Sequence, residues 1–176
     1  MKLILFSGIP GTGKSTLSED IARTLHIPVF SLDWVLGAML LSNLRVQKQD
    51  YSTTAEALLT MLIQRQLMLG QSAILDTPAN TVSERKRWQN LAQSYSAAFY
   101  GIETICSDIV LHRRRVEGRK RGIPGWHDTV GWSHVESMRA TREVWSADEG
   151  QYLTIDAVDP LNENVQIILK YVQSLM

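Results

Sequence analysis

A glycine-rich stretch near the start of the chain, GIPGTGKST at positions 8–16, has residue types and a spacing that suit phosphate binding. It matches the pattern G-x-x-x-x-G-K-[ST], in which glycines let the backbone curl until successive amide N–H groups point at phosphate oxygens. The lysine of this pattern reaches the β- and γ-phosphates, and the hydroxyl that follows ligates Mg²⁺. We therefore expect a nucleoside triphosphate site here, made by Gly8, Gly11, Thr12, Gly13, Lys14, Ser15 and Thr16.

The residues around Asp76 bear on the reaction at such a site. Asp76 ends the apolar run AILD at 73–76, so it can organise the Mg²⁺ shell or hold an acceptor. Thr77 follows it, at the place where motor-type ATPases carry a glutamate that polarises the attacking water. The sequence also lacks the N-K-x-D stretch of guanine-specific GTPases. Both absences favour transfer of the γ-phosphoryl group to an acceptor other than water.

A second aspartate, Asp33, closes the predicted strand at 27–32. Ligands of open α/β folds bind at the edge of the sheet where strands end, so its carboxylate is our candidate for the general base that deprotonates an attacking hydroxyl. The alternative is that Asp33 caps the helix that begins at Trp34. One residue can do both.

Six of the nine residues at 113–121 are basic, in a chain whose Lys+Arg and Asp+Glu both number 18. A charge run is usually a solvated helix face, and Arg113 and Arg114 fit that interpretation. Arg115 and Arg119 are four residues apart, which predicts one face of a helix, and with Arg121 they are candidates to clamp the transferring phosphate. The following GIPG at 122–125 gives this region the composition of a lid that moves.

The hydrophobic pattern predicts strands and helices in alternation. Strands are expected at 2–7, 27–32, 72–75, within 97–106 and at 152–155, and helices at 15–25, 34–41, 54–69, 82–95, 108–121, 130–145 and 161–175. The helix at 34–41 is apolar nearly all round and is expected to be buried. Residues 42–53 are expected to be an exposed connection. The alternation predicts a single α/β domain over 1–176, with a mainly parallel sheet covered on both faces.

Composition excludes several classes of protein. The apolar fraction of 44% and charged fraction of 20% are ordinary for a folded globular domain. The zero formal charge argues against a protein dedicated to coating nucleic acid or anionic membranes. The single cysteine, Cys106, excludes an internal disulfide framework. Apolar runs are too short for a signal-peptide core or a membrane span, so we expect a cytoplasmic location.

The order of these motifs resembles the small P-loop kinases related to adenylate kinase, gluconate kinase and the kinase domain of polynucleotide 5′-kinases. The resemblance rests on GIPGTGKST at 8–16, SLD at 31–33, AILDT at 73–77, the arginine-rich 113–121 and TIDAVDPLNENV at 154–165. It implies a three-layer fold, a five-stranded parallel sheet in the order 2-3-1-4-5 and a short helical lid at about 113–130.

The resemblance also implies roles for particular residues, with ATP and Mg²⁺ as the bound species. Asp33 would activate the acceptor hydroxyl, and Arg115 and Arg119 would be the lid arginines of the transfer. Adenine would rest near the turn after the last strand, at Ala157, Val158 and Asp159, with a lid arginine such as Arg121 on its other face. Ser15 and Asp76 would hold the metal.

No motif in the sequence identifies the acceptor. Trp34 and Trp126 could stack on a flat or sugar-like substrate, although a core position is the more common fate of a tryptophan such as Trp34. Trp88, Trp132 and Trp145 are expected to be packing residues, and the histidines show no metal pattern. A small hydroxyl compound such as a nucleoside, sugar or antibiotic ranks first. The alternatives are a polynucleotide 5′-hydroxyl, a regulatory module that binds ATP without transfer, and a slow ATPase.

Overall fold

The strands of the protein form one parallel sheet in the computed structural model, which describes residues 1–42, 47, 50–125 and 130–173. The strand order is β2-β3-β1-β4-β5, and every neighbouring pair is parallel. This confirms the predicted sheet and its order. The bounds are β1 Lys2–Ser7, β2 Val29–Ser31, β3 Ala73–Asp76, β4 Ala98–Ile105 and β5 Tyr152–Asp156.

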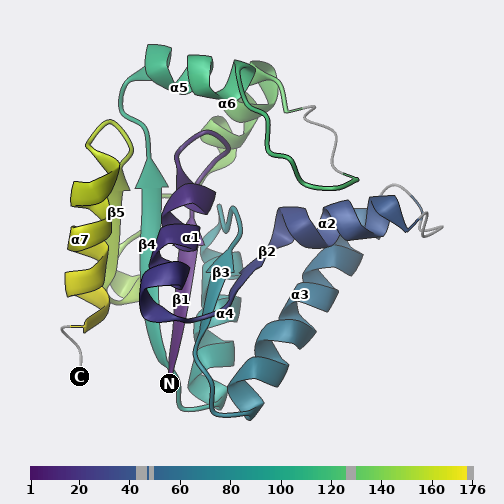
Figure 1. The fold of residues 1–176 in the computed structure, drawn as a ribbon, viewed down its shortest axis with the longest axis vertical. Coiled ribbons are helices and arrows are strands. Elements are labelled where there is room, and N and C mark those ends of the chain that lie inside the picture. Colours follow the sequence, from purple (N-terminus) through teal and green to yellow (C-terminus); the bar gives the residue numbers. More distant parts are fainter. Residues whose placement is uncertain (43–46, 48–49, 126–129, 174–176) are drawn as a thin grey trace.

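Helices cover both faces of this sheet (Figure 1). The described residues contain α1 Lys14–Leu25, α2 Leu32–Leu41, α3 Tyr51–Met68, α4 Val82–Ser94, α5 Ile109–Glu117, α6 Trp132–Thr141 and α7 Leu161–Gln173. A 3-10 turn, η2, spans Ala147–Glu149. Helices α5 and α6 lie together beyond the carboxyl end of the sheet, above the loop that joins β1 to α1.

The sequence of the central strand β1 is a continuous apolar run because both of its faces are covered by helices. Leu3 and Leu5 face the layer of α3 and α4, whereas Ile4 and Phe6 face the layer of α1 and α7. All four side chains are fully buried. A parallel strand with helices on both faces needs apolar residues at every position, and this burial contributes to the hydrophobic stabilisation of the fold.

Two helices end earlier than the sequence predicted, and the end of α5 shapes the lid. Helix α5 ends at Glu117 with Gly118 as its C-cap, so the basic residues 119–121 lie beyond the helix and not on one face with Arg115. Glycine ends helices readily because it exposes backbone and has no side chain to pack. Helix α6 ends at Thr141, four residues short of Trp145, which instead packs over Gly101 of β4.

The predicted burial of the helix at 34–41 is wrong. In α2, Trp34 is 50% exposed and Leu41 is 62% exposed, while Met39 and Gly37 are buried. The reason is that α2 lies beside the edge of the sheet, where α3 packs against it and the segment around Ile123 reaches Gly37, so the rest of its surface stays open (Figure 1). Helix α3 also begins at Tyr51, within the segment that we expected to be a connection.

Candidate active site

A cleft of about 540 Å³ opens at the carboxyl ends of the strands. Its walls come from the loop after β1, the first turns of α1, the arginine-rich segment, Trp34 of α2 and the turn between β5 and α7. Ten of the predicted site residues line it, namely Gly11, Gly13, Lys14, Ser15, Thr16, Arg115, Arg119, Arg121, Ala157 and Asp159. The phosphate loop, the arginine-rich segment and the turn after β5 are therefore brought together, whereas Asp33 and Asp76 are not among the residues that line this cleft.

Two amides of the loop at residues 8–13, those of Gly11 and Gly13, are available for a ligand. Hydrogen bonds hold its carbonyl groups outward, since Ile9 O accepts from Thr12 Oγ1 at 2.8 Å and Gly13 O accepts from Leu17 N at 3.0 Å. Within the described part of the chain, no hydrogen bond uses the amides of Gly11 or Gly13. Both glycines have positive φ, of 89° and 83°. Free amides beside the N-terminus of α1 form an anion site.

Gly8 and Thr12 lie at the base of this loop and do not line the cleft. Gly8 N donates to Pro78 O at 3.0 Å, and Thr12 Oγ1 lies 2.7 Å from Thr104 Oγ1 of β4. Thr104 Oγ1 in turn donates to Ser7 O at 3.0 Å. These two predicted ligands thus anchor the loop to the sheet.

Lys14 and Asp76 form a nearly buried ion pair on the floor of the site. Lys14 Nζ lies 3.5 Å from Asp76 Oδ1, and the two side chains are 7% and 4% exposed. Burial lowers the pKa of Lys14, and the nearby Arg121 and Arg119 lower it further, although Asp76 opposes them. A cation held among other cations in a dry site is poised to accept a multiply charged anion.

Asp33 lies in the first turn of α2 and is held by two residues of the arginine-rich segment. Its carboxylate forms an ion pair with Arg121, and Arg119 Nη2 lies 3.9 Å from Asp33 Oδ2. Arg121 Nη2 also donates to Ser15 Oγ at 2.7 Å. Asp33 does not cap the helix, because the N-cap is Ser31 and no side chain bonds to the first amides there. The candidate base, the lid and the phosphate loop are therefore linked directly.

Arg115 lies at the other end of the cleft, toward β5. Its Nη1 is 4.0 Å from Cys106 Sγ at the end of β4, and its charge helps to lower the pKa of Asp156, which burial alone would raise. Asp156 Oδ1 accepts from the amides of Ser107 and Val158, at 3.2 and 3.1 Å, and so fixes the turn after β5. Arg115 is thus beside the predicted adenine turn, whereas Arg121 is beside Ser15.

The turn after β5 presents Ala157 and Asp159 to the cleft, while Val158 is 46% exposed and outside it. Asn164 of α7 is buried and donates to Asp156 O at 2.9 Å and to Asp159 O at 3.4 Å. This buried amide, which sequence reasoning missed, holds the turn against the helix.

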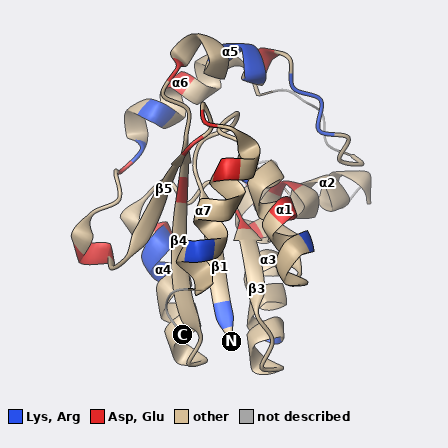
Figure 2. Cartoon of the chain, turned by 60° about the vertical axis from the view of Figure 1, so that its left-hand side comes forward, with Lys and Arg blue, Asp and Glu red and all other residues tan. Residues whose placement is uncertain are grey.

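The segment after α5 extends across the cleft to α2, and basic residues lie along it and along α5 (Figure 2). Ile123 is buried, and a Cβ placed on Gly37 would lie 2.7 Å from both Ile123 Cγ2 and Pro124 O. Only glycine at position 37 allows this approach. The predicted lid therefore lies over the site, although Trp126, His127 and Asp128 fall outside the described residues.

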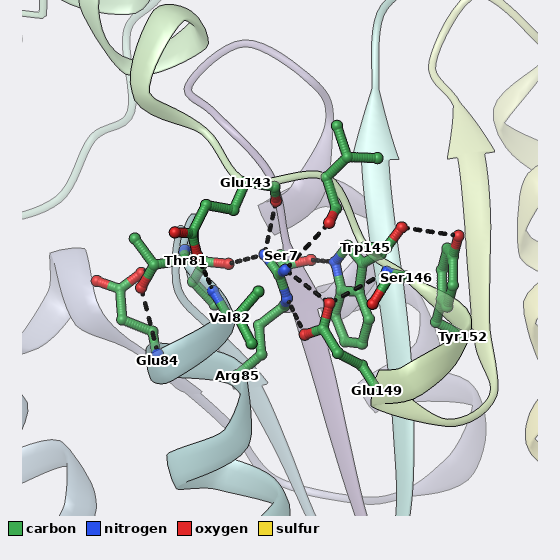
Figure 3. A network of polar contacts seen from close by, with 12 residues as sticks. Ser7, Thr81, Val82, Glu84, Arg85, Glu143, Trp145, Ser146, Glu149 and Tyr152 are labelled. Atoms are coloured by element: carbon green, nitrogen blue, oxygen red, sulfur yellow. Dashed lines mark hydrogen bonds and ion pairs between the residues drawn. The ribbon is translucent and has the colours of Figure 1, made fainter.

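A buried network of polar contacts supports the start of the phosphate loop from the face of the sheet opposite to α1 (Figure 3). Sequence reasoning missed this network. Arg85 makes two bonds to Glu149, at 2.6 and 2.8 Å, and its guanidinium lies 4.8 Å from the centre of the Trp145 ring. Trp145 Nε1 donates to Ser7 Oγ at 3.1 Å, next to the first residue of the loop. The only signal in the sequence is the Ser146-x-x-Glu149 spacing of a capping box, which is present here.

A second cavity, of about 310 Å³, shares two walls, Glu19 and Trp34, with the first. Its other walls are Ser18, Val29, Ser31 and Asp76. The half-exposed ring of Trp34 separates the two spaces, so this tryptophan is available to a ligand. Trp88 and Trp145 are buried packing residues, as predicted. In the described part of the chain, no helix has the length and apolar character needed to cross a membrane.

Comparison with known proteins identifies the family of the chain and supports its fold. A family model described as an AAA domain matches residues 3–144. No curated protein sequence matches the chain. Because the similar solved structures described next are all below 25% identity, their likeness establishes the fold alone.

Three of these structures cover nearly the whole chain. A provisionally assigned kinase from Chloroflexus aurantiacus is 24% identical with a TM-score of 0.73, covering 99% of this chain and 97% of its own. Kti12 from Chaetomium thermophilum in complex with ADP-AlF3 is 16% identical with a TM-score of 0.77, covering 99% of each chain. A gluconokinase from Sinorhizobium meliloti is 20% identical with a TM-score of 0.67, covering 99% and 93%.

Proposed function

Because this chain belongs to the AAA domain family, and because Asp33 pairs with two arginines that line the cleft beside the phosphate loop, we propose that it is an ATP-dependent kinase. It transfers the γ-phosphoryl group to a hydroxyl group of a small molecule. The observation that carries this proposal is the Asp33–Arg121–Ser15 connection, which joins a candidate base to the phosphate loop.

The donor, ATP, occupies the 540 Å³ cleft in this proposal. The amides of Gly11 and Gly13 and the ammonium group of Lys14 contact the phosphates, and the adenine lies near Ala157. Arg115 lies near the adenine in this proposal, since it is already beside the turn after β5. The Kti12 structure contains ADP-AlF3, which supports a nucleotide in a fold of this kind.

Ser15 and Asp76 are the residues that would hold Mg²⁺. A hydroxyl and a carboxylate are the hard oxygen donors that this ion prefers, and both belong to the elements around the Lys14 ammonium group. Bound magnesium would neutralise charge on the phosphate oxygens. Arg121 would then move away from Ser15 Oγ, because a divalent cation on this oxygen repels the guanidinium group.

The transfer step depends on Asp33. Without nucleotide its carboxylate is neutralised by Arg119 and Arg121, whose charges a polyphosphate competes for. When the arginines turn to the phosphate, Asp33 is free to accept the proton of the acceptor hydroxyl. A bond forms between the acceptor oxygen and the γ-phosphorus, the bond to the β–γ bridging oxygen breaks, and ADP leaves. Arginines and Lys14 stabilise the charge that this step spreads over the phosphoryl oxygens.

Transfer to water is disfavoured by the residues around Asp76. Buried Thr77 follows it and supplies no carboxylate to polarise a water molecule. The lid segment packs on α2 at Gly37, and its closure around a bound nucleotide would exclude solvent from the reacting groups. A kinase with a covered site keeps the phosphoryl group from hydrolysis.

The acceptor is proposed to be a small hydroxyl compound bound in the second cavity. Among the described residues that form its walls there is neither lysine nor arginine, which disfavours a strongly anionic acceptor. Trp34 provides an aromatic surface for a sugar or nucleoside ring, and Ser31 and Glu19 provide hydrogen-bonding groups. A polynucleotide acceptor would need basic residues on this side, and the chain has zero formal charge. The reaction belongs in the cytoplasm, where ATP is supplied.

The test uses γ-labelled ATP, Mg²⁺ and separate pools of nucleosides, neutral sugars, sugar acids, aminoglycosides and 5′-hydroxyl oligonucleotides. Wild type and Asp33→Ala are compared, with ATP binding measured for both. We expect label on one small-molecule pool with the wild type, and intact ATP binding but no labelled product with Asp33→Ala. Free phosphate alone, equal in both proteins, would indicate an ATPase or a nucleotide sensor instead.

A further inference from the structure

The outer part of the phosphate loop packs tightly against α5. His112 is fully buried, and its Nε2 lies 2.7 Å from Pro10 O. A Cβ placed on Gly11 would lie 2.6 Å from Val116 Cγ2 and 2.9 Å from His112 Cδ2. No residue larger than glycine fits between the loop and this helix. The loop therefore takes its shape partly from α5, which lies about a hundred residues further along the chain.

The second ring nitrogen of His112 fixes the tautomer. Nδ1 lies 2.8 Å from Arg139 Nη2 of α6, and a guanidinium group can only donate hydrogen bonds. Nδ1 must therefore accept, which leaves the proton on Nε2, where it is donated to Pro10 O. Burial lowers the pKa of His112, and the charges of Arg139 on α6 and Arg115 on α5 lower it further, against the Pro10 carbonyl, which raises it. The ring is thus held neutral.

Helix α6 also covers the His112 ring with an aromatic side chain. Trp132 of α6 meets His112 edge-on, with ring centres 5.3 Å apart, and the Arg139 guanidinium lies 5.5 Å from the centre of the Trp132 ring. Arg139 is therefore placed by α6 on both the tryptophan and the histidine. The connection runs from α6 through Arg139 and His112 to the loop.

The Pro10 carbonyl matters because of the geometry of an anion-binding loop. Amides point inward only where the carbonyl groups between them point outward. Ile9 O and Gly13 O are held outward by donors within the loop and α1. In the described residues, His112 is the only donor to Pro10 O. Loss of that donor frees the Pro10–Gly11 peptide to rotate, which would turn the Gly11 amide away from the phosphate.

We propose that His112 is a positioning residue for nucleotide binding, and that Arg139 maintains the tautomer in which it works. Helices α5 and α6 are then part of the nucleotide site although neither His112 nor Arg139 lines the cleft. The proposal rests on the proposed function only in that the loop binds a nucleotide.

Two substitutions at His112 separate the hydrogen bond from packing. His112→Gln retains an N–H donor at about the reach of Nε2, whereas His112→Leu fills a similar space without a donor. By calorimetry, we expect Mg-ATP affinity to fall about tenfold in His112→Leu and by less than about threefold in His112→Gln. Adenosine, which has no phosphate, should bind equally to all three proteins. Equal ATP affinity in His112→Leu and wild type would overturn the proposal, whatever the melting temperatures.

Arg139 is tested by Arg139→Met and Arg139→Gln, since only the glutamine variant can still donate to Nδ1. We expect weaker ATP binding in Arg139→Met, partial retention in Arg139→Gln, and no additional loss when Arg139→Met is combined with His112→Leu. Fully additive losses would show that Arg139 acts separately and would overturn its role.

A spectroscopic measurement needs no nucleotide, so it distinguishes a failure of this proposal from a failure of the proposed function. Long-range ¹H–¹⁵N NMR spectra report the tautomer of each histidine, and His112→Gln assigns the signal. We expect the neutral Nε2–H form in wild type at pH 7 and a larger fraction of the charged ring in Arg139→Met, because the Arg139 charge no longer lowers the pKa of His112. A charged ring, or the Nδ1–H form in wild type, would overturn the proposal even if ATP binds. Normal His112 spectra without ATP binding would overturn the kinase assignment alone.

Discussion

The charge of Lys14 illustrates how a single residue is adapted to its ligand. Its ammonium group is nearly buried with one anionic partner, Asp76, and its pKa is lowered first by burial and then by two arginines. A bound phosphate would stabilise this ammonium group strongly, because it replaces the water contacts that burial removed. Lys14→Met should therefore weaken ATP binding by about ten- to a hundredfold, as expected for loss of charged hydrogen bonds.

Calorimetry on Lys14→Met and Lys170→Met checks this expectation. Lys170 lies in α7 and does not line the cleft, so its variant removes the same charge without touching the site. ATP affinity that falls equally in both variants would point to net charge as the cause and would contradict the assignment of Lys14.

The arginines show the limit of residue-level prediction. The sequence identified Arg115, Arg119 and Arg121 as residues of the site, and all three line the cleft. It could not assign their positions, because the prediction continued the helix through Gly118. With the helix ending at Glu117, Arg121 reaches Ser15 and Asp33, while Arg115 stays beside Cys106. The expected roles of Arg115 and Arg121 are therefore exchanged in our proposal.

At the scale of elements, the Arg85–Glu149 pair connects α4 to the chain that returns from α6. Both side chains are 1% exposed, and Arg85 also donates to Glu143 O at 2.9 Å. Removal of one partner leaves a buried charge without compensation. Arg85→Met should lower the free energy of unfolding by about 3–5 kcal/mol, whereas Arg85→Met/Glu149→Leu should recover most of that loss.

Urea unfolding of the two variants and the wild type gives this comparison. If the double variant were as unstable as Arg85→Met, the cost would come from lost packing on Trp145 and not from the unpaired Glu149 carboxylate. Such a result would contradict the electrostatic account of this network.

At the scale of the whole molecule, stability should depend on pH through His112. Its pKa is lowered by burial from the usual 6.5, so the unfolded chain takes up a proton at a higher pH than the folded chain does. The stabilising effect of the neutral ring is thus present above about pH 6.5 and is lost as the pH falls below it. His112→Gln should show a flatter decline in this range, because glutamine does not titrate.

Urea unfolding of both proteins between pH 5 and 8 provides the measurement, with a difference in slope of up to about 1.4 kcal/mol per pH unit. Glu149 acts at lower pH. Burial raises the pKa of Glu149, but hydrogen bonds from Arg85 and Ser146 outweigh this and lower it from 4.5. The contribution of Glu149 to stability is therefore lost at a lower pH than that of His112. Parallel curves for wild type and His112→Gln above pH 5 would contradict the assignment of the upper loss to His112.

The architecture of the whole chain could be predicted because local signals agreed. Buried strands such as β1 are continuous apolar runs, and the phosphate loop has a specific pattern, so both were placed correctly. The resemblance supplied the strand order. Contacts between segments that are distant in the sequence produce no local pattern from which they could be predicted. His112 reaches Pro10 across 102 positions and Arg85 reaches Glu149 across 64, so sequence reasoning missed both. The exposure of α2 was missed because an apolar pattern does not show which helices lie at an edge.

The most direct test of the central claim is the fate of the γ-phosphate in ³¹P NMR, with the acceptor pool that supports turnover. The wild type should convert ATP to ADP and a phosphate ester, and Asp33→Asn should bind ATP at least as tightly yet form ester at least about a hundredfold more slowly. A normal rate of ester formation in Asp33→Asn would show that Asp33 is not the base. Inorganic phosphate as the only product of the wild type would contradict the kinase itself.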